Sequence, residues 1–146
     1  MEGKSLLKKM RVLDFTRVLS GPFATMMLGD LGAEVTKIEP PNGDESRSWP
    51  PILKNGVSAY FLALNRNKRS IALNLKEERA RNIVLKLAAE SDVVVENFTP
   101  GVVAKLGIDY ETLKKENPQI IYCAISGSAK TGRIVTKRPT IPLFRE

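Results

Sequence analysis

The sequence predicts an α/β fold: a Rossmann-like open parallel sheet with helices on both of its faces. Short apolar runs rich in Val, Ile and Leu alternate along the chain with segments of helical periodicity. Such compact β-branched runs are typical of strands buried on both faces of a parallel sheet, and their alternation with helices is the pattern of βαβ units. The expected strands are residues 10–15, 34–39, 70–75, 92–97 and 119–126.

The first strand is followed by a helix that the sequence brackets with Pro22 and Gly32. Proline suits the first helical position, and glycine suits the residue just past the helix end. After the alternating second strand, residues 40–57 are rich in Pro, Gly, Asn and Ser and predict a long loop. Residues 59–64 are expected to form a short helix.

The segment 77–90 gives the clearest helix prediction, because its apolar residues form one stripe and acids lead its first turn. Residues 101–107 and 110–117 predict two shorter helices before the fifth strand. Residues 1–132 are therefore expected to form the Rossmann-like domain. Residues 133–146 show neither helical nor strand periodicity and contain two prolines, so they are expected to form a loose basic tail.

The composition excludes several kinds of chemistry. The 146 residues include no histidine, which removes Ser-His-Asp and Cys-His catalysis and any His-ligated metal site. The single cysteine, Cys123, lies in "IIYCAIS" and is interpreted as a thiol packed in a buried strand rather than as a nucleophile. Acid–base chemistry would depend on carboxylates, lysines or a bound ligand, and no metal is expected.

The net charge of +7 is concentrated at the two ends of the chain. Residues 1–11 and 131–146 each carry four Lys or Arg against one acid, so the segment between them is nearly neutral. Nucleic-acid binding favours a clustered basic face with aromatic platforms, so a polyanion-binding module is only an alternative and no nucleic-acid partner is expected. No apolar run approaches the ~20 residues that span a bilayer, and no signal peptide is recognised; a cytoplasmic location without membrane contact is expected.

The ends of the strands are where a ligand is expected. In an open parallel sheet, ligands bind outside the carboxyl ends of the strands, near the point where the strand order reverses. In a 3-2-1-4-5 order the first and fourth strands meet at that point, so Arg17, Ser20, Asn97 and Phe98 should converge on one crevice. Arg17 suits a phosphate, Gly21 would let a ligand approach the backbone, and the next helix begins with unpaired N–H groups. An anionic, nucleotide-like ligand is expected, although the glycine-rich dinucleotide and P-loop fingerprints are absent.

Each of these residues also has a structural interpretation. Ser20 either caps the helix or contacts the ligand, and Arg17 is either a ligand contact or a solvated surface residue. Asp14 is interpreted as a structural carboxylate bonded to nearby backbone N–H groups, in preference to a catalytic base. Residues 65–70, "NRNKRS", are either a polar basic loop or part of the site, and Lys105 is either a ligand contact or plain surface.

Three long stretches resemble a known family: "VLDFTRVLSGPFATMMLGDLGAEVTKIEPPNGDESR", "NRNKRSIALNLK" and "DVVVENFTPGVVAKLGIDYETLKKENPQIIYCAISG". In order and spacing, from residue 10 to about 132, they are similar to the N-terminal part of the class III CoA-transferases. That family includes formyl-CoA transferase, succinate–hydroxymethylglutarate CoA-transferase, L-carnitine dehydratase and α-methylacyl-CoA racemase. The resemblance implies a truncated Rossmann-like large domain with coenzyme A along the carboxyl edge of its sheet. The coenzyme A contacts that it implies are Arg17, Leu19, Ser20, Leu73, Asn74, Leu75, Lys76, Asn97, Phe98 and Lys105.

The resemblance also implies the chemistry of the full-length family, which transfers CoA from an acyl-CoA to a carboxylic acid and forms interlocked homodimers. An aspartate attacks the thioester there, and it lies further along than this chain extends, so the chain is expected to be inactive alone. After Ser126 and Gly127 the family continues with an aromatic residue and Gly-Gln-Thr-Gly-Pro, whereas this chain departs from that pattern through Arg133. A non-catalytic CoA-binding remnant and the racemase or dehydratase branches are the alternatives. The acyl group, the acceptor acid, the oligomeric state and the origin of the C-terminus stay open.

Overall fold

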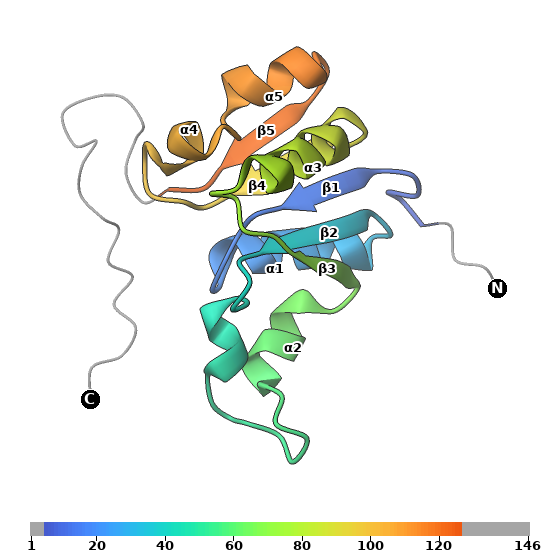
Figure 1. The fold of residues 1–146 in the computed structure, drawn as a ribbon. Helices are drawn as coiled ribbons and strands as arrows, with labels where there is room; N and C mark the ends of the chain where they lie inside the picture. Colours follow the sequence, from blue (N-terminus) through green and yellow to red (C-terminus); the bar gives the residue numbers. More distant parts are fainter. Residues whose placement is uncertain (1–4, 127–146) are drawn as a thin grey trace.

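The computed structural model describes residues 5–126, in which one five-stranded sheet lies between two layers of helices (Figure 1). The strands lie in the order β3-β2-β1-β4-β5, and every neighbouring pair is parallel. The predicted α/β class, the parallel sheet and the strand order are therefore confirmed. The strands are β1 (Arg11–Asp14), β2 (Glu34–Glu39), β3 (Lys68–Ala72), β4 (Val93–Glu96) and β5 (Ile121–Ala124).

Helices cover both faces of the sheet, as expected (Figure 1). α1 and α2 lie on one face, and α3, α4 and α5 lie on the other. The chain changes face in the β3-to-β4 crossover, which carries it past β1 and so creates the reversal of strand order. The helices are α1 (Ser20–Asp30), α2 (Ala59–Asn65), α3 (Glu78–Ala89), α4 (Val102–Leu106) and α5 (Tyr110–Glu116), with a 3₁₀ helix η1 (Glu45–Ser48).

Several predicted boundaries need correction. α1 begins at Ser20 rather than at Pro22, because a proline is tolerated anywhere in a first turn whose N–H groups have no helical partner. The expected end is confirmed: Gly32 follows the helix with a φ of +100°. The expected loop at 40–57 contains η1, since the side chain of Asp44 caps it by accepting a hydrogen bond from the Ser46 N–H at 3.0 Å.

Two apolar clusters hold the layers together, one on each face of the sheet. On one face Leu13 and Val94 pack against Val84 of α3 and Leu113 of α5, all 1% exposed or less. On the other, Val12, Val35, Val93 and Val95 form a cluster against which Leu28 of α1 packs. The strands are thus buried on both faces near the centre of the sheet, which explains their continuous apolar sequences.

The expectation for Cys123 was wrong, because its thiol side chain is exposed. β5 is an edge strand, and Ile121 on the same face is 61% exposed. Tyr122 points to the opposite face, where its hydroxyl donates to the Ile108 carbonyl at 3.2 Å. The run "IIYCAI" is apolar on both sides, so its sequence does not reveal which face is covered.

An ion pair between a buried carboxylate and a half-exposed arginine anchors η1 to the sheet. Glu39, at the end of β2 and 3% exposed, accepts two hydrogen bonds from the Arg47 guanidinium at 2.8 and 2.7 Å. Its carboxylate also accepts from the Asp44 N–H at 2.8 Å and from the Ser70 hydroxyl. Burial alone would raise the pKa of Glu39, but these hydrogen bonds outweigh it and lower the pKa from 4.5 to about 2.

The predicted basic tail, residues 133–146, lies outside the described residues. Within residues 5–126, no helix is long and apolar enough to cross a membrane.

Leu113→Ala tests the packing of the core between the sheet and α5. Leu113 is fully buried, so its removal loses apolar burial and leaves a cavity that together cost about 2–5 kcal/mol of the free energy of unfolding. The matched control is Leu62→Ala on α2, whose side chain is 47% exposed and whose loss should change stability by about 0.5 kcal/mol or less. Denaturant unfolding of both variants checks this, and equal losses would contradict the assignment of the core.

The Glu39 ion pair predicts a specific dependence of stability on pH. Because the folded-state pKa lies below the unfolded value, the stabilisation is fully present above pH 4.5 and disappears as the pH falls through 2. At pH 7 it is worth about 3 kcal/mol at most. Unfolding of Glu39→Gln should therefore show its largest loss at pH 7 and a shrinking difference from the unmodified chain below pH 4.5. A difference independent of pH would show that the carboxylate charge is not what stabilises η1.

Candidate functional site

The turn that follows β1 is fastened to the turn that follows β4. The Asn97 side chain accepts a hydrogen bond from the Arg17 N–H at 2.9 Å and donates one to the Arg17 carbonyl at 2.8 Å. One amide thus satisfies both backbone groups of one residue, as a neighbouring strand would. These two turns flank the point where the strand order reverses, so Arg17 and Asn97 lie side by side there, as the predicted convergence requires.

The same turn is conformationally strained. Val18 has a φ of +71°, a region that β-branched residues rarely occupy and that costs of order 1–3 kcal/mol. The start of α1 packs closely against this turn: a Cβ atom on Gly21 would lie 2.3 Å from the Cβ atom of Thr16. Gly21 is thus required for contact between the start of α1 and the turn. This packing explains the glycine, and the approach of a ligand to its backbone stays a prediction.

Beside the turn lies a slot of about 160 Å³, lined mainly by apolar side chains. Its walls come from the ends of four strands and from α4, so residues far apart in sequence meet there. They are Phe15, Arg17, Ile38, Glu39, Pro40, Pro41, Leu73, Asn74, Leu75, Lys76, Phe98 and Leu106.

Two cations border this apolar slot. The Arg17 guanidinium lies 5.3 Å from the centroid of the Phe98 ring, within the range of a cation–π contact. Among residues 5–126, no carboxylate forms an ion pair with that guanidinium or with Lys76. Glu39 also lines the slot, but Arg47 already engages its carboxylate. The slot thus combines apolar walls with positive charge available to an anion.

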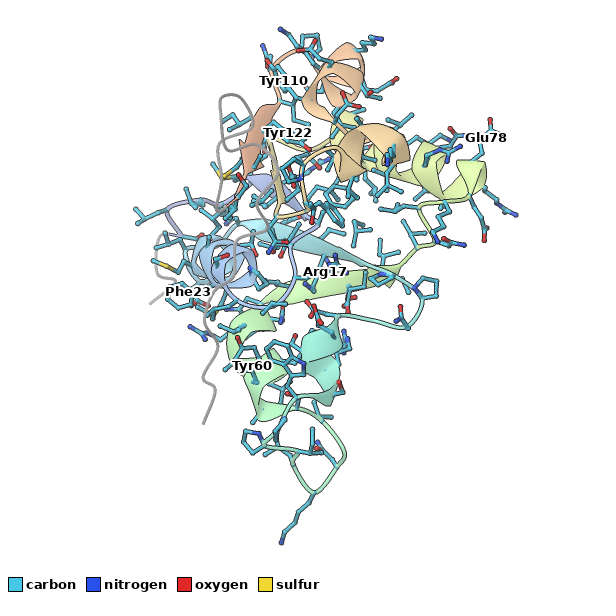
Figure 2. The ribbon with its side chains drawn as sticks, turned by 90° about the vertical axis from the view of Figure 1, so that its left-hand side faces the viewer. Arg17, Phe23, Tyr60, Glu78, Tyr110 and Tyr122 are labelled. Atoms are coloured by element: carbon cyan, nitrogen blue, oxygen red, sulfur yellow. The ribbon has the colours of Figure 1, made fainter. Side chains whose placement is uncertain are left out.

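A second, open hollow of about 650 Å³ adjoins the slot and shares Arg17 and Pro40 with it. Its remaining lining comes from the segment after β2, at Asn42 to Glu45, Arg47 and Ser48, and is mostly polar. In Figure 2, Arg17 lies where the sheet approaches η1. A ligand with one apolar end and a long polar remainder could occupy both spaces.

The structure brings together six of the ten residues expected in the site, since Arg17, Phe98 and Leu73 to Lys76 all line the slot. Asn97 acts on the backbone of the turn. Leu19 and Ser20 lie exposed at the start of α1 and Lys105 lies exposed on α4, outside the lining of both spaces. Leu19, not Ser20, is the N-cap residue of α1, and no side chain caps that helix, so Ser20 does not have the capping role considered for it.

Asp14 has the structural role that was preferred for it. It is fully buried and accepts hydrogen bonds from the Thr16 N–H at 2.9 Å and from the hydroxyls of Thr16 and Thr25. The Lys68 ammonium lies 3.0 Å from its Oδ2 atom. Burial lowers the pKa of Lys68 despite this partner. The segment "NRNKRS" is therefore not a surface loop throughout, because β3 begins at Lys68 and the ammonium of this residue is buried beside Asp14.

Sequence reasoning missed several slot residues, chiefly Pro40, Pro41 and Leu106. Pro40 and Pro41 follow β2, so the strand-end rule applied to the second strand would have found them. Leu106 gave no signal, because its place depends on how α4 docks. Within the described residues, no group of three or more His, Cys, Asp or Glu could hold a metal ion.

Comparisons with known proteins identify the family of the chain. Residues 7–141 match the family described as CoA-transferase family III. The chain is 56% identical over 127 residues to succinyl-CoA:glutarate CoA-transferase of Mus musculus, covering 86% of this chain and 29% of that protein. It is 50% identical over 122 residues to acetyl-CoA:oxalate CoA-transferase of Acetobacter aceti, covering 83% and 31%.

A solved structure shares the fold. The crystal structure of a CAIB/BAIF family protein from Brucella suis superposes with a TM-score of 0.87 at 43% identity, covering 92% of this chain and 36% of that one. The chain thus spans about a third of the length of the relatives that it matches. Since the family match extends over most of its length, the chain belongs to CoA-transferase family III.

Proposed function

We propose that this chain binds coenzyme A or an acyl-CoA along the carboxyl ends of its strands, as the N-terminal part of an enzyme that transfers CoA between carboxylic acids. The observation that carries the proposal is the apolar slot bordered by the cations of Arg17 and Lys76, neither of which forms an ion pair with another described residue. Coenzyme A joins a planar adenine ring, phosphates and a long pantetheine arm. An apolar slot with cations at its edge complements the ring and the phosphates together.

The size of the slot supports partial insertion of the ligand. Sites that enclose a whole small molecule have volumes of roughly 300–1,000 Å³, and the slot has about 160 Å³. It would therefore take one part of coenzyme A, and the adenine ring suits its apolar walls. The remainder would extend past Arg17 into the adjoining polar hollow.

The reaction itself would need a carboxylate nucleophile, because the family chemistry proceeds through an acyl anhydride. The carboxylate of Glu39, which lines the slot, and that of Asp14, at the end of β1, are both buried and already engaged by cations and hydrogen bonds. We therefore propose that the described residues bind the substrate and that the nucleophile comes from elsewhere in the complete enzyme. The chain alone should bind coenzyme A without turnover.

The acid substrate is proposed to be a dicarboxylic acid. The names of several relatives pair CoA with such acids: glutarate in the Mus musculus protein, oxalate in the Acetobacter aceti protein and mesaconate in a Haloarcula marismortui protein. This support comes from similarity and leaves the particular acid open.

Isothermal titration of the chain with coenzyme A tests the binding proposal. Arg17→Ala and Lys76→Ala should each weaken binding about tenfold, the order of one charge-assisted hydrogen bond. Lys115→Ala is the matched control, since it removes an exposed lysine of α5 that lies outside both spaces. Absence of heat at millimolar coenzyme A from a folded sample would contradict the proposal, as would equal losses in all three variants.

A further inference from the structure

We propose that Lys37 is a positioning residue for the ligand site: its buried ammonium fixes the Arg17 turn relative to the η1 segment. The inference rests on the proposed function, because it assigns a role in the same coenzyme A site. Lys37 touches neither the slot nor the hollow and is absent from the lining of both. Its effect would be transmitted through the two backbone segments that it joins.

The geometry of Lys37 is that of a bridge. The residue lies on β2 and is 1% exposed. Its Nζ atom donates a hydrogen bond to the Thr16 carbonyl at 2.6 Å and lies 3.0 Å from Oδ2 of Asp44. Thr16 directly precedes Arg17, and Asp44 caps η1 and lines the hollow. One ammonium therefore connects the turn after β1 with the segment after β2.

The other end of the bridge is equally well fixed. Asp44 is 1% exposed, and its Oδ1 atom accepts from the Ser46 N–H at 3.0 Å and the Ser46 hydroxyl at 2.8 Å. Burial would raise the pKa of Asp44, but the charge of Lys37 and the bonds from Ser46 lower it. The Asp44 carboxylate is therefore charged, so its contact with the Lys37 ammonium is a buried ion pair.

A buried ion pair is a poor means of stabilising a fold, because desolvation of the two charges offsets most of their attraction. An apolar side chain would fill the same space without that cost. What the charge adds is a defined distance: the ammonium donates a hydrogen bond to the Thr16 carbonyl and attracts the Asp44 carboxylate to 3.0 Å, so it favours one separation of the two segments. That separation sets the position of Arg17, which borders both the slot and the hollow.

A double substitution separates positioning from general stability. Lys37→Met alone leaves the Asp44 charge buried and unpaired, so it should destabilise the fold strongly. Lys37→Met combined with Asp44→Asn removes both charges and keeps an oxygen that can cap η1, so it should recover most of the stability. We expect both variants to bind coenzyme A at least tenfold more weakly than the unmodified chain, as measured by titration.

A second readout does not depend on coenzyme A. Hydrogen exchange of the Arg17 amide, which donates to Asn97, should be at least tenfold faster in the double variant, while amides of β4 keep their protection. If the unmodified chain binds no coenzyme A, the proposed function fails, and the exchange rates still decide the positioning role.

A double variant with restored stability, unchanged affinity and unchanged exchange at Arg17 would overturn the proposal and leave Lys37 a purely structural residue. Asp44→Asn alone is the fallback variant: it leaves the Lys37 ammonium without its counter-charge but keeps the hydrogen bond from Lys37 to Thr16. If both Lys37 variants fail to fold, this variant decides through hydrogen exchange, because Asp44 itself lines the hollow: faster exchange of the Arg17 amide in a folded sample supports the bridge, and unchanged exchange rejects it.

Discussion

The arrangement of the site depends on the pair of hydrogen bonds between the Asn97 side chain and the backbone of Arg17. These bonds join the loops after β1 and β4, the two strands between which the sheet reverses its order. A parallel sheet by itself leaves such loops free to diverge. The amide of Asn97 fixes the Arg17 turn, even though Val18 beside it has an unfavourable φ. The guanidinium then stays over Phe98 at the edge of the slot.

Buried charged side chains of the strands also bind the segments that follow them. Glu39 holds Arg47, Lys37 reaches Thr16 and Asp44, and Lys68 reaches Asp14. Each charge is matched by an opposite charge or by several hydrogen bonds, which is the condition for tolerating it in the interior. Buried charged side chains therefore gather near the carboxyl ends of β1 and β2, whereas the clusters near the centre of the sheet are apolar.

The sequence allowed most of the architecture to be predicted, because parallel strands and amphipathic helices have distinct periodicities. The strand-end rule also placed Arg17, Asn97 and Phe98 at the reversal of strand order, but not Ser20 correctly, and the family resemblance added the segment from Leu73 to Lys76. Features that depend on tertiary packing could not be predicted. The exposure of Cys123 depends on which face of an edge strand is covered, and the burial of Lys68 depends on Asp14, far away in sequence. Nor does the sequence show that Gly21 makes room for Thr16.

The central claim is that coenzyme A lies at the carboxyl ends of the strands, with its apolar part in the slot beside Arg17. Mapping of backbone amide shifts in the ¹⁵N-labelled chain on addition of coenzyme A tests this most directly. The account predicts the largest changes at Arg17, Phe98 and residues 73–76, and small changes at Asp92 and Ile121 on the opposite edge of the sheet. Changes centred on that opposite edge, with Arg17 and Phe98 unmoved, would contradict it.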